Sequence, residues 1–175
     1  MPEVAQEIVT ALEKEGIPYR LLSHSRFRTM EECRLIQGID TENTALFKNV
    51  FLCNRQKSAF YLLLLSAEKR FVTSQVSKAL LSSRLSFGSE EDLLRLLNAT
   101  SGSVSPAGLL FDTECAVRLA VDEDIAAKPF LAFHPNDCSK TVVMARDDFF
   151  GRFLPLTHHS PVLLSLPAIA ENAAV

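Results

Sequence analysis

The sequence predicts an α+β fold, a single compact domain in which helices flank a curled, mixed and largely antiparallel β-sheet. Strand-like segments come in adjacent pairs, and the helical segments are not spaced as regular crossovers between parallel strands. No glycine-rich nucleotide-binding motif is present, which argues against a doubly wound fold. The chain has 175 residues, 47% of them hydrophobic and 22% charged, as in an ordinary globular protein. We expect one domain over residues 1–155 and a C-terminal tail over residues 156–175.

In the N-terminal half, apolar spacing and capping residues define each element. Apolar residues recur at helical spacing from Val4 to Leu12, and Gly16 ends this first helix. Thr29 and Glu32 form the T-x-x-E pattern of a capping box, which opens a short second helix. The polar sequence NRQK separates two strand-like segments, as a hairpin turn does. We expect helices at residues 4–16 and 29–38, and strands at residues 17–24, 44–54 and 58–66.

In the C-terminal half, Ser89 is the clearest helix start, because acidic residues fill the first turn after it. Residues 115–122 alternate between apolar and polar side chains, as a strand with one buried face does. We expect helices at residues 74–83, 89–102 and 146–154, strands at residues 115–122, 129–135 and 140–145, a loop or irregular strand at residues 103–111, and a loose end at residues 166–175.

The charge and hydropathy patterns exclude some classes of protein. A formal net charge of -3 argues against broad, charge-driven coating of nucleic acid, so any nucleic-acid contact must be local. The longest apolar run, FYLLLL, is far shorter than a membrane span. The first residues carry acids and a lysine among apolar positions, unlike a signal peptide. We expect a cytoplasmic protein that does not bind a membrane.

Four widely separated cysteines form no C-x-x-C pair of the kind that zinc sites and redox motifs use. The four histidines add no metal-ligand spacing to them. We therefore expect reduced thiols, no metal and no cofactor. The cysteines are Cys33, Cys53, Cys115 and Cys138.

Lys48 stands in the middle of TALFKNVFL, a stretch that is otherwise suited to burial. In a strand its neighbours on the same side are Leu46, Val50 and Leu52, and the opposite side is also mainly apolar. The ammonium group must therefore reach water at a strand end, pair with an acid, or project into a cavity where a ligand supplies negative charge. No acid lies close in sequence, and the residues alone leave these alternatives open.

Two further segments could carry chemistry. The run SGSVSPAG over residues 101–108 has small residues closed by a proline, so its backbone N–H groups can approach a carbonyl oxygen or a phosphate. Gly102 within it is equally consistent with a helix C-cap. His134 ends a predicted strand just before a proline turn, where it is either a structural histidine or part of a site. No serine has a recognisable acid partner, and among the cysteines only Cys138 has a histidine nearby in sequence, so nucleophilic catalysis is poorly supported.

Together, these segments resemble one known family. The stretches KNVFL, YLLLL, RLSFGSEEDLLRLL, GSVSPAGLLFD, VRLAVDEDI and FHPNDCSKTVVM are similar in order and spacing to the YbaK/prolyl-tRNA synthetase-associated domain family. Within that family the chain is most similar to the free-standing prolyl-tRNA editing deacylases of the ProXp-ala or PrdX-like type. The resemblance extends over residues 17–154.

The resemblance implies a compact mixed fold that hydrolyses the ester between a wrongly attached amino acid and the terminal adenosine of a tRNA. It implies that Lys48 is the essential polar residue near that terminus, and that backbone N–H groups of the G-x-x-x-P loop receive the substrate carbonyl. It implies that His134 lines the aminoacyl pocket. The resulting candidates are Lys48, Gly102 and Ser103 for catalysis, and Asn49, Ser105, Pro106, Phe133 and His134 for substrate binding.

One departure from the family pattern follows His134. Cys138, Ser139 and Lys140 stand before Thr141, where the family usually has an asparagine and then threonines. A cysteine cannot make the paired hydrogen bonds of an amide, so a different arrangement of this loop is expected.

The resemblance implies removal of alanine from the proline tRNA, with the tRNA acceptor end as partner and prolyl-tRNA synthetase as a candidate partner. The water-activating base is expected to be a ribose hydroxyl or a backbone carbonyl. Two alternatives stay open: a deacylase for cysteine, serine or another small amino acid, and a catalytically silent relative that binds aminoacyl-tRNA or a synthetase as a regulator. The oligomeric state does not follow from the sequence.

Overall fold

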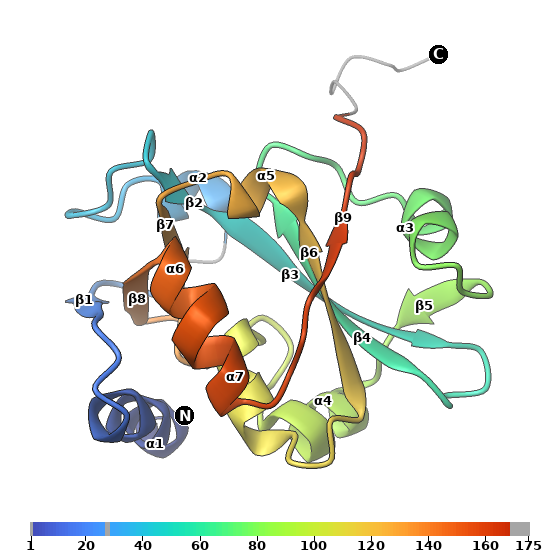
Figure 1. Ribbon diagram of the computed structural model, residues 1–175, viewed down its shortest axis with the longest axis horizontal. Helices are drawn as coiled ribbons and strands as arrows, with labels where there is room; N and C mark the ends of the chain where they lie inside the picture. The colour runs from blue at the N-terminus through green and yellow to red at the C-terminus, as the bar shows by residue number, and fades with distance from the viewer. Residues whose placement is uncertain (1, 27–28, 169–175) are drawn as a thin grey trace.

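The computed structural model describes residues 2–26 and 29–168 (Figure 1). Strands cross the middle of the molecule, and helices cover them on both sides (Figure 1). The strands are β1 (Arg20–Ser23), β2 (Thr44–Ala45), β3 (Phe47–Asn54), β4 (Phe60–Ser66), β5 (Leu85–Phe87), β6 (Val117–Asp122), β7 (Phe130–Phe133), β8 (Lys140–Ala145) and β9 (Val162–Leu164).

The helices are short except for the first. In the described residues, none is long and apolar enough to cross a membrane. The helical elements are α1 (Pro2–Lys14), α2 (Met30–Cys33), α3 (Thr73–Ala79), α4 (Glu90–Leu97), the 3-10 helix η1 (Pro106–Phe111), α5 (Glu123–Ala126), α6 (Arg146–Asp148), the π-helical turn η2 (Phe149–Phe153) and α7 (Leu154–Leu156).

The strands form two mixed sheets, with orders β1-β8-β7-β2 and β5-β3-β4-β6-β9. Antiparallel pairs join β1 to β8, β7 to β8, β3 to β4 and β3 to β5, while β2–β7, β4–β6 and β6–β9 are parallel. The predicted α+β class with mixed pairing is confirmed, but the curled sheet is divided in two. The division falls within the predicted strand 44–54. Leu46 leaves the ladder and accepts a hydrogen bond from the Ala67 N–H, so β2 joins one sheet and β3 the other.

The five-stranded sheet separates two apolar clusters. Alternate residues of β3 and β4 enter the larger cluster with α1, α4 and η2, and the intervening residues enter a smaller cluster with α3. This explains why the run FYLLLL is apolar throughout: β4 is central, and both of its faces are buried.

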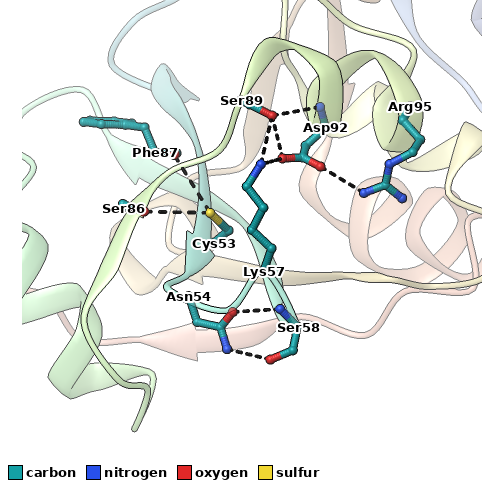
Figure 2. Close-up of polar contacts among 9 residues, drawn as sticks. All are labelled: Cys53, Asn54, Lys57, Ser58, Ser86, Phe87, Ser89, Asp92 and Arg95. Atoms are coloured by element: carbon teal, nitrogen blue, oxygen red, sulfur yellow. Dashed lines mark hydrogen bonds and ion pairs between the residues drawn. The ribbon is translucent and has the colours of Figure 1, made fainter.

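The start of α4 is tied to the β3–β4 hairpin, as Figure 2 shows. Ser89 caps the helix by accepting a hydrogen bond from the Asp92 N–H, which confirms the predicted N-cap. The Asp92 carboxylate in turn lies 2.8 Å from the Lys57 ammonium and 3.0 Å from the Arg95 guanidinium. Hydrogen bonds from Lys57 and Ser89 hold the pKa of Asp92 well below its usual range. These contacts hold the start of α4 against the hairpin.

Residues 103–111, expected as a loop or irregular strand, contain the helix η1. Pro106 occupies its first turn, and the Ser105 hydroxyl accepts a hydrogen bond from the Ala107 N–H. Gly108 lies so close to α4 that an added Cβ would be 2.8 Å from the Leu97 carbonyl oxygen. The sequence pattern also missed β5, α5 and β9, which are three or four residues long, too short for a period to be recognised.

The packed structure continues beyond residue 155, where we had expected the tail to begin. β9 pairs with β6 in parallel, and Leu164 and Leu166 are buried in the smaller apolar cluster. His159 is buried as well, with its Nε2 atom 3.1 Å from the Asp112 carboxylate. A parallel partner strand lies far away in sequence, so this pairing has no local signal. Residues 169–175, most of the predicted loose end, lie outside the described residues.

Candidate active site

A cavity of about 620 Å³ opens where the start of β3, the end of β7, the turn after α4 and the helix α2 meet. This volume is typical of a small-molecule site. Six of the eight predicted site residues line it: Lys48, Asn49, Gly102, Ser103, Phe133 and His134. The rest of the lining is formed by His24, Arg26, Thr29, Met30, Cys33, Ile36, Ile39, Leu46, Phe47, Thr100, Ser101, Val104, Ala132, Asn136, Asp137, Cys138 and Thr141.

Lys48 is half-buried at this cavity, near the start of β3. Its Nζ atom donates a hydrogen bond of 2.7 Å to the backbone carbonyl of Lys69. Among the described residues it forms no ion pair with an acid, which excludes one of the three alternatives that the sequence left open. The ammonium group therefore keeps donors that a ligand in the cavity can use.

The carbonyl that holds Lys48 belongs to a turn fixed by a buried ion pair. The Lys69 ammonium lies 2.8 Å from Asp122 and 2.8 Å from Asp124, and the side chains of Lys69 and Asp122 are 5% and 0% exposed. Asp122 also accepts a hydrogen bond from the Ser66 N–H. Burial lowers the pKa of Lys69, but hydrogen bonds with the two carboxylates outweigh it and raise that pKa above its usual value. Lys69 thus remains charged and keeps its turn in place.

Replacing Lys69 with methionine is expected to destabilise the protein by about 3 to 5 kcal/mol, because it leaves the buried Asp122 carboxylate without its cation. Urea unfolding monitored by circular dichroism measures this loss. Lys57→Met is the matched control: it also breaks a Lys–Asp pair of 2.8 Å, but the Lys57 side chain is 54% exposed, so a much smaller loss is expected. Equal midpoints for the two variants would show that the buried pair does not hold the turn.

The turn after α4 has a defined geometry. Thr100 and Ser103 are joined by a hydrogen bond from the Ser103 N–H to the Thr100 carbonyl and by one from the Thr100 N–H to the Ser103 hydroxyl. Gly102, third in this turn, has a φ of +84°, which the third position of a type II turn requires. The C-cap of α4 is Asn98, with a φ of 47°. The interpretation of Gly102 as the helix cap was therefore wrong, and its conformation serves the turn at the cavity.

The two predicted oxyanion donors, the N–H groups of Gly102 and Ser103, differ in whether they are already hydrogen-bonded. The Ser103 N–H is already used by the Thr100 carbonyl at 2.9 Å. The Gly102 N–H has no hydrogen-bond partner among the described residues, and apart from its chain neighbours no described residue has an atom within 4 Å of the position of a Cβ on Gly102. The Ser101 N–H is bound by the carboxylate of Glu90, which holds the turn against α4. Gly102 is thus the better candidate donor of the pair.

Ser105 and Pro106 are not part of the cavity lining. Ser105 is fully buried and donates a hydrogen bond of 3.0 Å to the Asn136 side chain, while Pro106 starts η1. Both residues hold the turn from behind and have no direct access to a substrate.

Asn136 is a site residue that the sequence reasoning did not identify. It is fully buried, with a φ of 52°, and its amide donates to the carbonyls of Leu97 and Asn98 at 3.0 and 3.3 Å. With the bond from Ser105, one side chain links the end of α4, the start of η1 and the loop after β7. The only signal in the sequence was its position two residues after His134. That position does not reveal that its partners are Leu97 and Asn98, about 40 positions earlier.

His134 and Asn49, which both line the cavity, each contain an unsatisfied polar atom. His134 Nδ1 and Asn49 Oδ1 are buried and have no hydrogen-bond partner among the described residues. Burial, with a smaller contribution from His24, lowers the pKa of His134 from 6.5 to about 4. The imidazole is therefore neutral near pH 7. Such unsatisfied atoms are costly unless a ligand pairs with them, so both point to a binding role.

Acid should destabilise the protein through His134. In the folded state the pKa is about 4, against 6.5 for an ordinary histidine, so between these values the unfolded chain binds more protons. Stability is expected to be unaffected above pH 6.5 and to fall as the pH drops towards 4, by about 2 to 3 kcal/mol at pH 4.5. Urea unfolding at several pH values measures this. The His134→Gln variant, whose side chain cannot titrate, should lose less stability over the same pH range. Equal losses of stability in the variant and the wild-type protein would contradict the assignment of this effect to His134.

Phe133 joins the cavity to the core. Its ring packs at 5.7 Å from Phe149 and 5.8 Å from Phe153, and all three rings are almost completely buried. The wall that it forms therefore cannot move without repacking the aromatic cluster.

Cys138, the departure from the family pattern, contacts the opposite loop. Its Sγ atom lies 3.0 Å from the Gly102 carbonyl oxygen, to which the thiol donates. Burial raises the pKa of this thiol, so it stays protonated and keeps the donor. The four cysteines are free. Among the described residues, no cluster of three or more His, Cys, Asp or Glu side chains could hold a metal ion.

Comparison with known proteins identifies the family. The aminoacyl-tRNA editing domain family matches residues 24–151 of the chain. The prolyl-tRNA editing protein ProX of Acetoanaerobium sticklandii is 32% identical over 147 residues, which cover 83% of this chain and 88% of that protein. The chain belongs to the aminoacyl-tRNA editing domain family. The resemblance inferred from the sequence is confirmed, and the chain is an aminoacyl-tRNA deacylase, a hydrolase that acts on aminoacyl-tRNA.

Two solved structures have the same fold as this editing domain. A protein ascribed a trans-editing role for prolyl-tRNA synthetase has a TM-score of 0.70 at 18% identity, covering 94% of this chain and 98% of that chain. The hypothetical protein APE2540 has a TM-score of 0.68 at 14% identity, covering 91% of this chain and 99% of that chain. At such identities the comparison concerns the fold alone, and it confirms the single α+β editing domain.

Proposed function

We propose that this editing domain removes alanine from mischarged proline tRNA, acting in trans in the cytoplasm on the product of prolyl-tRNA synthetase. The observation that supports the proposal best is the set of groups around the cavity. Within residues 2–26 and 29–168, Lys48 has no acid partner, the Gly102 N–H is free, and a polar atom of His134 and one of Asn49 are unsatisfied. The ProX relative is a prolyl-tRNA editing protein by name, which favours the proline tRNA.

Each group has a role in ester hydrolysis. The Lys48 ammonium binds the phosphate and ribose end of the terminal adenosine, and the aminoacyl group lies against His134 and Asn49. Water attacks the ester carbonyl, and the developing oxyanion accepts a hydrogen bond from the Gly102 N–H. The bond from carbon to the ribose oxygen then breaks, and that oxygen takes a proton. Because an aminoacyl ester is already activated, positioning and one oxyanion donor suffice without a protein nucleophile.

Water activation is assigned to the substrate or the backbone. A histidine with a pKa near 4 is a weak base at neutral pH, so His134 is a poor candidate for this step. A free hydroxyl of the terminal ribose or a backbone carbonyl at the cavity can orient the water. His134 instead shapes the aminoacyl pocket.

A panel of purified misacylated tRNAs tests the proposal. Alanyl ester on the proline tRNA should be cleaved fastest, and cysteinyl and seryl esters on the same tRNA measure the alternative amino acids. Cleavage of the cysteinyl or seryl ester in preference to alanyl would replace the assigned amino acid and keep the reaction. Release of no amino acid from any member would leave a regulator that binds aminoacyl-tRNA or a synthetase.

A further inference from the structure

Within the part of the chain that the structure describes, a single carboxylate lines the cavity. It belongs to Asp137, in the loop between β7 and β8, and only 6% of this residue is exposed. The lysine and the arginine of the lining, Lys48 and Arg26, come from β3 and from the segment after β1. No described cation forms an ion pair with Asp137. The cavity therefore has a negative group that the protein itself does not neutralise.

Asp137 is ionised near neutral pH. Its Oδ1 atom accepts hydrogen bonds from the Ser139 N–H at 3.0 Å and from the Ser139 hydroxyl at 2.8 Å. Burial raises the pKa of Asp137, but these two bonds, with a smaller contribution from Lys140, outweigh it and hold that pKa below its usual value. A buried charge of this kind is costly unless a positive group pairs with it.

The carboxylate has one oxygen left for a ligand. Because Ser139 binds Oδ1, the turn is fixed through that atom, and the Oδ2 atom of Asp137 has no hydrogen-bond partner within residues 2–26 and 29–168. Asn49 Oδ1 is a second acceptor of the lining without a donor, and an amide oxygen can only accept. Two acceptors at one cavity, one of them charged, are satisfied by a ligand that brings positively charged donors.

The aminoacyl end of the substrate has such donors. Its free α-amino group takes up a proton near neutral pH and then has three N–H donors and a positive charge. The other groups near the ester are different: its oxygens only accept, the ribose hydroxyls are neutral, and the methyl group of alanine is apolar. The phosphate of the terminal nucleotide is negative and suits Lys48. The two ends of the substrate thus match opposite charges of the cavity.

We propose that Asp137 is a specificity-determining residue whose carboxylate binds the α-ammonium group of the aminoacyl ester. This inference rests on the proposed function, because it assigns the amino end of the same substrate. The site then selects esters with a free amino group and discriminates against N-acylated esters such as peptidyl-tRNA, which lack this charge. A prolyl ester also has a protonated amine, so the choice between alanine and proline still depends on the wall that contains Phe133.

The test compares two esters of the proline tRNA that differ only at this group. The alanyl ester has an ammonium group, and the lactyl ester has a neutral hydroxyl in its place. Each kcat/KM is divided by the rate of spontaneous hydrolysis of the same ester, because the two esters differ in reactivity without enzyme. On this scale the wild-type protein is expected to prefer the alanyl ester by about ten- to a hundredfold, as for other hydrogen bonds to charged groups.

The Asp137→Asn variant removes the charge and keeps a side-chain oxygen that can accept both bonds from Ser139. Its kcat/KM should fall by about ten- to a hundredfold on the alanyl ester and stay nearly unchanged on the lactyl ester. Ser139→Ala is the matched control, because it removes one bond of the same turn and leaves the carboxylate charged. It should keep the wild-type ratio of alanyl to lactyl cleavage.

Two results would overturn the inference. Equal losses of Asp137→Asn on the two esters would show that Asp137 only supports its turn. Equal normalised rates of the wild-type protein on the two esters would show that the α-ammonium group is not recognised.

Binding of two analogues that cannot be hydrolysed separates this inference from the proposed function. Both are 3′-amino-3′-deoxyadenosine acylated on the 3′ nitrogen, one with alanine and the other with lactate, and calorimetry measures their affinities. If the wild-type protein binds the alanyl amide at least about tenfold more tightly, and Asp137→Asn removes this difference, the inference stands even when the alanyl ester is not cleaved. If the alanyl ester is cleaved but the two amides bind equally, the inference is overturned and the proposed function stands.

Discussion

Lys48→Ala is expected to abolish measurable deacylation, a loss of at least about a hundred- to a thousand-fold in kcat/KM, while the protein stays folded. Lys48 has no acid partner among the described residues, and its ammonium gives up only the hydrogen bond to the Lys69 carbonyl. Truncation therefore leaves no buried charge unpaired, and the cost to stability is small. The substrate loses the cation that receives its phosphate end. Deacylation assays and urea unfolding on the same preparation measure the two effects.

Two control variants define what Lys48 contributes. The Lys48→Arg variant should also be inactive in deacylation. A planar guanidinium cannot replace a compact ammonium that is held by one carbonyl in a half-buried position. Lys57→Ala removes a lysine from the far end of the same strand pair, outside the cavity lining, and should retain full activity. Wild-type turnover by Lys48→Ala would contradict the assignment of the site.

The alanyl ester on the proline tRNA is expected to be cleaved, and the correct prolyl ester is expected to be spared. A synthetase for proline cannot firmly reject alanine by binding alone, since each missing methylene is worth only about 1 to 3 kcal/mol. A second site that rejects the larger prolyl group by steric clash discriminates more strongly. Tightly packed walls can move to admit a larger group only at a high cost in free energy. Phe133 is part of such a wall, and its contacts with Phe149 and Phe153 keep it in place.

Enlarging the pocket should weaken that preference. His134→Ala removes a ring from the wall, so larger aminoacyl groups are expected to enter, and the ratio of alanyl to prolyl cleavage should fall by about tenfold or more. Rates on the two esters, measured side by side for both proteins, give this ratio. Similar wild-type rates on the prolyl and alanyl esters would show that size exclusion is wrong, even if the protein is a deacylase.

The sequence by itself determined the features that depend on near neighbours. The capping box of Thr29 and Glu32 and the N-cap Ser89 are formed as predicted, because such caps involve residues three positions apart. The central strands follow from their apolar runs. The quoted motifs identified the editing family, and they contain the six predicted residues that line the cavity.

Only the tertiary structure decided how these residues act. It showed that the Ser103 N–H is used within its turn, and that Ser105 and Pro106 support the site from behind. It also showed that Asn136 links the end of α4, the start of η1 and the loop after β7. It also supplied the partner of Lys48, a backbone carbonyl held by the buried pair of Lys69 and Asp122. Backbone groups carry no residue-specific signal, and partners that lie 21 and 53 positions apart meet only when the chain folds. The chain of contacts that positions the lysine therefore exists only in the folded protein.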